Sequence, residues 1–594
     1  MKHRMFHKAM FAAIAIFLML APEGRAASRD PLLAKAATLK RNLEVKGFQV
    51  LGDLNYSRFA QVDPVQMYCE GELDTCNGFN FKGSYDSPIV PPLPGQNETW
   101  ANTLFRIRFN EAIVLVGETP PPCDYFSYTA FLYYRYEQGW GPFNLRKIFS
   151  AFGDPLNLAV LNTGGAVYNK NIVMTFTSDK DTNNAIRTAA IGAGFPKEVF
   201  NTFVIPSSLL RTNQALDETT DQLLILNRTT LWQDGTSDGG GYVEHPRVVV
   251  FRVTPPNLSH KPLPAPRQRV RGSGVTEIDY GAAVEQLKEA ILKRYSHLSA
   301  NELVTSQWLM ESPLALQTST NTLGDSADTV YLSTQEPFKL SDTDDDFLIV
   351  YGVNHQKSGK CTYHNINVYK QFNACGVASA FDHCNGNPDC HDFAGSAWEY
   401  LHDQLAPQSD QLFALKIARK CNPDERYCLV VKKPTDVCGE GAELDAGLFI
   451  GFRAYLEPKT KTGPAYTELL FDKVIHFTPV SPPTVSPSSP TYIYDGNVTE
   501  PVTIDFNVAS MSPGDVTWEA QIEYVDAVGC GTIEPDQGKI NITNGTGSGQ
   551  FKFTADYPGP EQFPGYYYLT VTAKDQQGRF SSTEVLVQIH KPQS

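Results

Sequence analysis

The sequence predicts a β-rich α+β fold: two related, mainly antiparallel α+β units followed by a small β-sandwich. Many short β-branched and aromatic runs lie between turn residues, which is typical of strands. Two stretches instead place apolar residues at helical spacing, each ahead of a series of strand patterns. A proline- and serine-rich stretch then separates the last part of the chain from the rest, as a linker does.

The first unit (28–262) and the second unit (270–480) show six features in the same order. Each unit begins with a helical pattern, PLLAKAATLKRNLEV in the first and YGAAVEQLKEAILKRY in the second. The strand patterns that follow pair as TLFRIRF (103–109) with TVYLST (329–334), EAIVLVG (111–117) with DFLIVYG (346–352), CDYFSYTAFLYY (123–134) with CTYHNINVY (361–369), NIVMTFTSDKD (171–181) with QLFALKIARKC (411–421), and VVVFRVTPP (248–256) with LFIGFRAYLEP (448–458). The ordered set predicts an internal duplication.

The C-terminal part consists of a Pro/Ser linker (481–491) and a β-rich module (492–594). Alternating runs such as TIDFNV and VTWEAQIEYV, with turn residues between them, predict a small β-sandwich. The piece GYYYLTVTAKDQQGRFSSTEVLVQI (565–589) resembles the last two strands of bacterial immunoglobulin-like and PKD-type modules. This resemblance implies an immunoglobulin-like β-sandwich of the kind that serves as a spacer or adhesion unit, whereas residues 28–480 resemble no family.

The first 27 residues have the pattern of a secretory signal peptide. Basic residues precede an apolar run from Ala9 to Ala21, and the small residues Gly24 and Ala26 follow where a signal peptidase would cleave. The run is shorter than the roughly 20 residues that span a bilayer. We therefore expect an exported protein, periplasmic, extracellular or at the cell surface, with no transmembrane segment after signal removal.

The acidic composition limits the classes of partner. The formal net charge is −15 at pH 7, whereas nucleic acids and anionic membranes bind basic surfaces. We therefore expect no nucleic-acid partner, and a glycan, a peptide or a cell-surface polymer instead.

The 11 cysteines of an exported chain are expected to form disulfides. Three pairs are close enough in sequence to close local loops: Cys69 with Cys76, Cys384 with Cys390, and Cys421 with Cys428. The odd number leaves at least one cysteine unpaired. No C-x-x-C spacing occurs, so a zinc ribbon or a thioredoxin-like site is not expected.

The segment VYGVNHQKSGKCTYHNINVY (350–369) carries two histidines in a predicted β-hairpin with its turn at QKSG. Since side chains on a strand alternate between faces, His355 and His364 would lie on the same face of this hairpin. His383 and His391 offer further ligands of the kind that zinc and iron sites use. A site for a divalent metal is therefore one hypothesis, although the sequence requires no cofactor.

The alternative is that these four histidines are polar residues on a half-exposed hairpin and a disulfide-closed loop. Pro120 and Phe126 occupy the positions of His355 and His364 in the first unit, whereas the cysteine of the segment is shared. The shared cysteine indicates matched strands, since a catalytic thiol needs a nearby base. Only the histidines are specific to the second unit.

The segment LSDTDDDFLIV places Asp342, Asp344 and Asp346 in a D-x-D-x-D pattern. Calcium loops use this spacing because alternate carboxylates converge on one ion. Phe347 and Val353 occupy the positions where an EF-hand needs glycine and glutamate, which excludes an EF-hand. The alternatives are a calcium site of another kind and a simple acidic turn before a strand.

No motif in the chain identifies a reaction. The loop WQDGTSDGGGY (232–242) lacks the lysine of a phosphate-binding loop, and RGSGVTE (271–277) is not a serine-hydrolase motif. We therefore predict an exported binding or surface-interaction protein. The alternative is a secreted enzyme, metal-assisted, with its site between the two α+β units, because clefts between such units are common ligand sites.

Overall fold

The structure is a computed structural model, and the predicted signal peptide lies outside the residues that it describes. It describes residues 30–56, 59–93, 103–141, 143–386, 390–401, 408–434, 440–480, 483–495, 500–510, 514–526, 531–542, 545–555, 565–576 and 578–590. These form two compact units, one of residues up to 291 with 302–475 and one of residues 292–301 with 476–594. No helix within the described ranges is long and apolar enough to cross a membrane.

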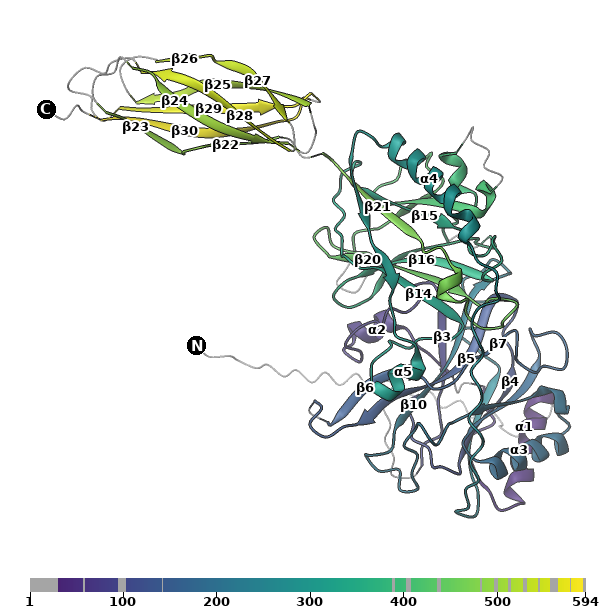
Figure 1. Cartoon of the computed structure of the whole chain (residues 1–594). Helices are drawn as coiled ribbons and strands as arrows, with labels where there is room; N and C mark the ends of the chain where they lie inside the picture. The colour runs from purple at the N-terminus through teal and green to yellow at the C-terminus, as the bar shows by residue number, and fades with distance from the viewer. Residues whose placement is uncertain are drawn as a thin grey trace, which may run out of the picture. The chain divides into compact units, whose positions relative to one another are not determined.

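The chain before the C-terminal module forms two halves, residues 30–262 and 270–478, and each half contains two β-sheets (Figure 1). We call the sheet that faces the other half the inner sheet and its neighbour the outer sheet. The outer sheets have the strand orders β1-β11-β4-β8-β9 and β12-β21-β15-β18-β19. The inner sheets have the orders β2-β3-β10-β5-β6 and β13-β14-β20-β16-β17, and β7 pairs with β5. The predicted β-rich α+β fold class is confirmed.

The elements of the first half begin and end as follows. Its strands are β1 (Gln49–Leu51), β2 (Phe59–Gln61), β3 (Ser84–Pro88), β4 (Ala112–Glu118), β5 (Cys123–Tyr136), β6 (Leu145–Ala151), β7 (Leu156–Asn157), β8 (Asn171–Thr177), β9 (Phe200–Val204), β10 (Gln222–Trp232) and β11 (Val248–Thr254). Its helices are α1 (Pro31–Glu44), α2 (Pro64–Cys69) and α3 (Lys180–Gly192), with a 3₁₀ turn η1 (Lys197–Val199).

The second half has a corresponding set of elements. Its strands are β12 (Ser299–Leu303), β13 (Thr305–Gln307), β14 (Thr329–Thr334), β15 (Phe347–Val353), β16 (Tyr363–Lys370), β17 (Gly376–Phe381), β18 (Leu412–Ala418), β19 (Cys428–Val430), β20 (Leu448–Tyr455) and β21 (Lys473–Thr478). Its helices are α4 (Gly281–Arg294) and α5 (Ser312–Thr318), with 3₁₀ turns η2 (Ile278–Tyr280), η3 (Ser396–Glu399), η4 (Ser409–Gln411) and η5 (Tyr466–Glu468).

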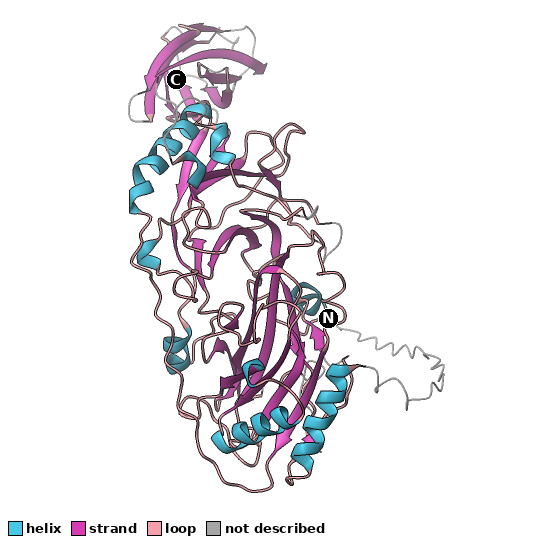
Figure 2. Ribbon diagram, turned by 90° about the vertical axis from the view of Figure 1, so that its right-hand side faces the viewer, coloured by secondary structure: helices cyan, strands magenta, loops and turns pink. Residues whose placement is uncertain are grey.

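Helices α1 and α3 pack on the outer sheet of the first half, where the helices lie at the periphery of the sheets (Figure 2). Asp30 caps α1 by accepting hydrogen bonds from the amides of Leu32 and Leu33, and Pro31 occupies the first helical turn, where its missing N–H costs nothing. Every third or fourth residue of α1 is buried, which gives the apolar face that the sequence predicted: Leu32, Ala36, Leu39 and Leu43.

The two halves match in strand register as well as in strand order. Arg228 of β10 lies opposite Tyr85 of β3, and Arg453 of β20 lies opposite Tyr331 of β14. The pairs β8–β9 and β18–β19 are parallel in an otherwise mainly antiparallel arrangement. Residues of the two halves can therefore be equated by counting from these pairs.

The inner sheets contact each other through reciprocal hydrogen bonds. Arg453 donates to the carbonyl oxygen of Gly78 in the first half, and Arg228 donates to the carbonyl oxygen of Gly324 in the second. The spacing from Gly78 to Tyr85 in the first half equals the spacing from Gly324 to Tyr331 in the second. Each of these tyrosines lies opposite the arginine of its own half. Such an exchange of equivalent contacts is what a twofold interface produces.

Three details of the predicted repeat were wrong. Residues 103–109 form no strand and contribute only a bridge at Phe105. The strand β11 corresponds in sheet position to β21, so its predicted match with β20 fails. The segment 350–369 is not a hairpin, because β15 lies in the outer sheet and β16 in the inner sheet. Both strands are buried along their whole length, so no alternation of exposed residues marks the sheet to which each belongs.

The C-terminal module is a β-sandwich of two sheets, in the orders β22-β24-β28-β26 and β23-β30-β29-β25-β27. Its strands are β22 (Thr484–Pro487), β23 (Thr491–Asp495), β24 (Val502–Ala509), β25 (Gly514–Asp526), β26 (Thr532–Glu534), β27 (Gln537–Ile542), β28 (Thr546–Thr554), β29 (Gly565–Lys574) and β30 (Phe580–His590). Alternate residues of β24 enter one core, as the sequence pattern predicted: Ile504, Phe506 and Val508.

The predicted linker at 481–491 is wrong in its middle part. Residues Thr484–Pro487 form β22, an edge strand of the sandwich in which Val485 lies opposite Val508 of β24. Proline is tolerated at the end of an edge strand because no sheet hydrogen bond needs its missing N–H. The proline- and serine-rich composition of this segment therefore indicated a linker where the chain forms a strand.

Candidate functional site

Two of the four predicted metal-binding histidines lie together in the second half. His355 follows β15, His364 belongs to β16, and their rings are 4.5 Å apart between centroids. Asp472, immediately before β21, faces both rings: its carboxylate oxygens lie 3.5 Å from Nε2 of His355 and 3.6 Å from Nε2 of His364. All three side chains are at most 1% exposed. The cluster is therefore sealed within the second half.

Glu277 holds the other side of the His355 ring. Nδ1 of His355 lies 2.8 Å and 3.0 Å from the two carboxylate oxygens of Glu277. Ser358 donates its hydroxyl to the same carboxylate at 2.5 Å, and the amide of Leu470 donates to it at 2.9 Å. These bonds leave Nε2 of His355 directed at Asp472.

The electrostatics of the cluster follow from its burial and its charges. Burial by itself lowers the pKa of His355, but the carboxylates of Glu277 and Asp472 outweigh it and raise that pKa to about 10. Burial raises the pKa of Asp472, but the two histidines outweigh that effect and hold the pKa well below its usual range. The cluster thus concentrates negative charge around one imidazole in a site without access to water.

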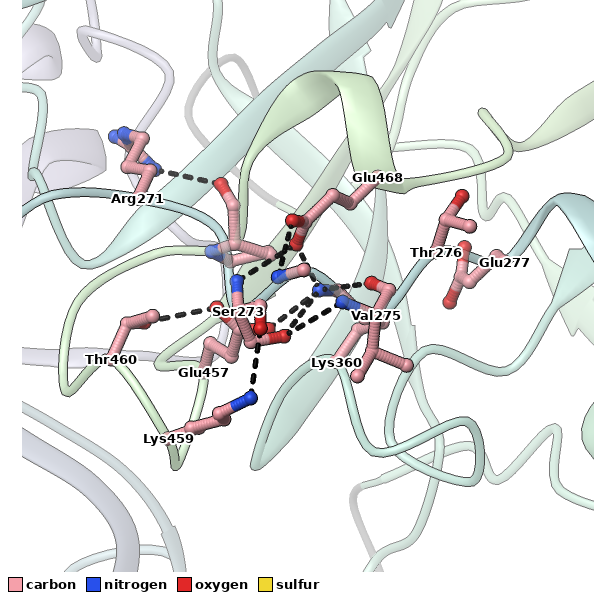
Figure 3. A network of polar contacts seen from close by, with 12 residues as sticks. Arg271, Ser273, Val275, Thr276, Glu277, Lys360, Glu457, Lys459, Thr460 and Glu468 are labelled. Atoms are coloured by element: carbon pink, nitrogen blue, oxygen red, sulfur yellow. Dashed lines mark hydrogen bonds and ion pairs between the residues drawn. The ribbon is translucent and has the colours of Figure 1, made fainter.

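A second buried polar group, centred on Lys360, fixes the connection between β15 and β16 (Figure 3). Nζ of Lys360 lies 2.5 Å from carboxylate oxygens of both Glu457 and Glu468, and donates to the carbonyl oxygen of Val275 at 2.9 Å. Val275 and Glu277 belong to the same short segment, as Figure 3 shows. This segment therefore positions Lys360 and His355 together.

His383 and His391 lie outside this cluster. His383 bridges two carboxylates, with Nε2 at 2.6 Å from Asp124 and Nδ1 at 3.1 Å from Asp382. The hydrogen bonds to these two carboxylates raise the pKa of His383 to about 10. His391 lines a surface cavity beside Lys432. The predicted set of four histidines is thus wrong as a single site.

The sequence interpretation missed Asp472 and Glu277. Both are at most 1% exposed, although each is a charged residue of a kind that is rarely buried. Asp472 occurs in the run LLFDKVIHF, and an acidic residue inside such an apolar run was the one available signal. Glu277 had no comparable signal.

The three aspartates of the predicted calcium loop do not gather around a common point. Asp342 lies 3.2 Å from Nζ of Lys420 and 2.7 Å from Nζ of Lys433. Hydrogen bonds to these lysines lower the pKa of Asp342. Asp346 accepts from the amide of Ser341, and Asp344 makes no group with them among the described residues that could hold a metal ion. The segment is an acidic turn before β15.

The disulfides join both nearby and distant cysteines. Cys384 bonds to Cys390, and Cys421 bonds to Cys428. The predicted pairing of Cys69 with Cys76 is wrong, because Cys76 bonds to Cys375 of the second half, 299 residues away. Sequence proximity could not show this pair, since the cross-link lies where the two halves meet.

The cysteine position that the two halves share holds no reactive thiol. Cys123 and Cys361 are free and buried. Burial raises the pKa of both thiols above the usual range, which disfavours the reactive thiolate. These cysteines act as core residues of matched strands.

A cavity of about 630 Å³ opens where the two halves meet. Residues 61–66 and 79–85 of the first half form most of its wall, and Gly376 and Glu440 of the second half complete it. A neighbouring cavity of about 200 Å³ runs along β17 and shares Phe81, Lys82 and Glu440 with the first. We call the two cavities together the β17 groove.

An exposed ion pair stands at the junction of the two cavities. Nζ of Lys82 lies 3.0 Å from a carboxylate oxygen of Glu440, and both side chains are more than a third exposed. Such a pair contributes little to stability, because solvent screens it. The junction can therefore open without a large free-energy cost.

Comparisons with known proteins identify no family. No family model matches the chain, and no curated protein matches it. Among solved structures, the chaperone DraB of E. coli is 9% identical over 18% of this chain and 55% of its own length, with a TM-score of 0.15. A PapD-like domain of human CEP192 is 12% identical over 18% of this chain and 86% of that domain, with a TM-score of 0.15.

An uncharacterized protein from Burkholderia cenocepacia is similar over a longer stretch, 77% of this chain and 90% of its own, at 11% identity and a TM-score of 0.32. The chain spans about half the length of DraB. At these scores the resemblances say nothing about the activity of this chain.

Proposed function

We propose that the protein is an exported binding protein that holds an extended polypeptide segment in the β17 groove. The size of the groove is the observation that carries the proposal: its larger cavity, at about 630 Å³, lies within the 300–1,000 Å³ typical of ligand pockets. The export itself rests on the predicted signal peptide and agrees with the presence of disulfides.

The wall of the groove favours a polypeptide over a compact ligand. β17 is the last strand of its inner sheet in the described part of the chain, and Val377, Ala378 and Ser379 line the smaller cavity. An edge strand offers main-chain hydrogen bonds to an added extended strand. Phe81 supplies an apolar contact, and Lys82 and Glu440 supply one charge of each sign.

We also propose that the two halves arose by internal duplication. Four observations support this: the strand orders, the positions of the parallel pairs, the Arg–Tyr register, and the reciprocal arginine–glycine contacts. A groove between two repeats is a common place for a ligand site. The equivalent edge strand of the first half, β6, borders a smaller cavity of about 250 Å³, so the β17 groove offers the larger of these two spaces.

The alternative, a metal-assisted secreted enzyme, has less support. Its chemistry would need a substrate to reach His355, His364 and Asp472. These side chains are at most 1% exposed, which gives a substrate no access.

The test uses a display library of linear peptides, followed by binding of the enriched peptide, synthesised with a fluorophore, to the full-length protein. Ser379→Trp fills the smaller cavity and is expected to weaken binding at least tenfold, an effect of about 1.4 kcal/mol. Lys82→Glu breaks the junction ion pair and is expected to change the charge preference of the enriched peptide.

Lys197→Glu is the matched control, because Lys197 is 80% exposed, pairs with Glu198 and lines none of these cavities. Its binding should equal that of the unaltered protein. Enrichment of no common sequence, or equal binding by the Ser379→Trp protein, would contradict the proposal.

A further inference from the structure

We propose that His355, His364 and Asp472 form a buried binding site for a zinc-like divalent metal ion. This inference is independent of the β17 groove and concerns the interior of the second half. It rests on the spacing of the donor atoms, on their lack of hydrogen-bond partners, and on the group behind His355.

The spacing of the donor atoms fits metal ligands better than hydrogen bonds. The two imidazole–carboxylate distances, 3.5 Å and 3.6 Å, exceed the 2.7–3.2 Å of ordinary N–H···O hydrogen bonds. Ligands bound to zinc at about 2.0–2.1 Å in a tetrahedron are roughly 3.3–3.4 Å apart. One donor atom from each residue also lies within 4.8 Å of the other two.

The donor atoms have no other partner in the described structure. Nε2 of His355, both ring nitrogens of His364 and both carboxylate oxygens of Asp472 are buried without a hydrogen bond. The large majority of buried side-chain polar atoms in proteins have a partner, so these five unsatisfied atoms need an explanation. One donor atom from each of the three residues faces a common point. A cation at that point would satisfy three of them at once.

The surroundings of His355 match those of a metal ligand. Its Nδ1 is bound by the carboxylate of Glu277, which is itself fixed by Ser358 and by the amide of Leu470. A carboxylate behind an imidazole is the usual outer partner of a zinc-bound histidine, because it orients the ring and makes the other nitrogen a better donor.

The donor set and the burial define the class of metal. Two imidazole nitrogens and one carboxylate suit zinc and neighbouring transition metals, whereas calcium and magnesium prefer oxygen ligands throughout. The complete burial indicates a structural ion that stabilises the second half. The first half, with Phe126 in place of His364, would lack this ion.

The test measures the metal content of the full-length protein, purified without chelator, by mass spectrometry. We expect stoichiometric zinc that is lost in His364→Phe, a variant that copies the residue of the first half and keeps an aromatic ring in the core. Asp472→Asn, which keeps the shape of the side chain, should also lose the ion. His383→Gln is the control, because His383 lies outside the cluster, and should keep its zinc.

A second measurement does not depend on the folding of any variant. After removal of metal by a chelator, the unaltered protein is titrated with Co²⁺, and tetrahedral nitrogen–oxygen coordination should give visible ligand-field absorption. Zinc should raise the melting temperature of this apoprotein, and magnesium should not. Absence of zinc together with absence of the cobalt spectrum, or equal zinc in His364→Phe and His383→Gln, overturns the proposal.

Discussion

In the first half, Phe126 stands where the second half has His364, and Asp86 stands where the second half has Leu332. The equivalence follows from the common register, since Asp86 comes one residue after Tyr85 and Leu332 one residue after Tyr331. Each half thus carries a buried ionisable side chain at a position where the other half is apolar. Since each of these positions is ionisable in one half and apolar in the other, the sheets do not need the ionisable side chains of His364 and Asp86 in order to form.

The two inter-half contacts differ in their covalent chemistry. At one contact, the amide of Cys76 donates to the carbonyl oxygen of Asn373, and Cys76 is bonded to Cys375. At the equivalent contact, the amide of Thr322 donates to the carbonyl oxygen of Ile148, with no disulfide. The same backbone geometry is therefore reinforced by a cross-link on one side only.

Among the changes that test this comparison, removal of the cross-link is expected to have the largest effect on the stability of the protein. Cys375→Ser should lower the free energy of unfolding by about 5 kcal/mol, because the bond closes a very long loop and restricts the unfolded chain. Cys390→Ser opens a bond between cysteines six residues apart and should cost about 2 kcal/mol on the same entropic account. Urea unfolding under non-reducing conditions measures both values, and equal losses would contradict the loop-length explanation.

The paired glycines test whether the two contacts are energetically equivalent. Gly78 and Gly324 have positive φ angles of 59° and 75°, and an added Cβ would overlap Trp308 or Phe149 of the opposite half. Gly78→Ala and Gly324→Ala should each cost about 3 kcal/mol, from overpacking and from the left-handed backbone. Thermal unfolding of the two variants should give similar losses, and a neutral effect at one site would break the proposed reciprocity.

Asp86 gives the first half a titrating group at a position where the second half has the apolar Leu332. Burial raises the pKa of Asp86 to about 8, so the folded protein keeps its proton over a range in which the unfolded chain, with an ordinary pKa, has lost it. The contribution of Asp86 to stability is therefore present below about pH 4 and declines as the pH rises to about 8, by at most about 1.4 kcal/mol per pH unit.

Asp86→Asn removes this titration while it keeps the shape of the side chain. The variant should gain stability relative to the unaltered protein between about pH 4 and pH 8, with a constant difference above that range. Parallel unfolding curves at pH 5 and pH 7 measure the change, expected at about 2 kcal/mol. A difference that does not vary with pH would show that Asp86 is ionised in the folded protein.

The sequence predicted some parts of this structure well because the signals were local. The apolar spacing of α1 and α4 and the alternation of β24 each mark an element by itself. The sheet membership of β15 and β16 was not predictable, because strands buried on both faces show no alternation. His355 and His364 were found as a pair, but Asp472 joins them from more than a hundred residues away, where no local pattern links it to them.

The smallest expected effect concerns the ion pair through which His383 joins the halves. Its imidazole lies between Asp124 of the first half and Asp382 of the second, and these carboxylates raise its pKa to about 10. Since the folded pKa lies above the unfolded value of about 6.5, the stabilisation is complete below pH 6.5 and is lost as the pH rises toward 10.

His383→Gln should therefore lower stability by about 1 kcal/mol at pH 6, a modest value because the ring is partly exposed and solvent screens the pair. The deficit relative to the unaltered protein should shrink at pH 9 and vanish above pH 10. High salt should reduce it at pH 6, because screening weakens an exposed ion pair. A deficit that stays constant from pH 6 to pH 10 would mean that His383 joins the halves by packing and not by its charge.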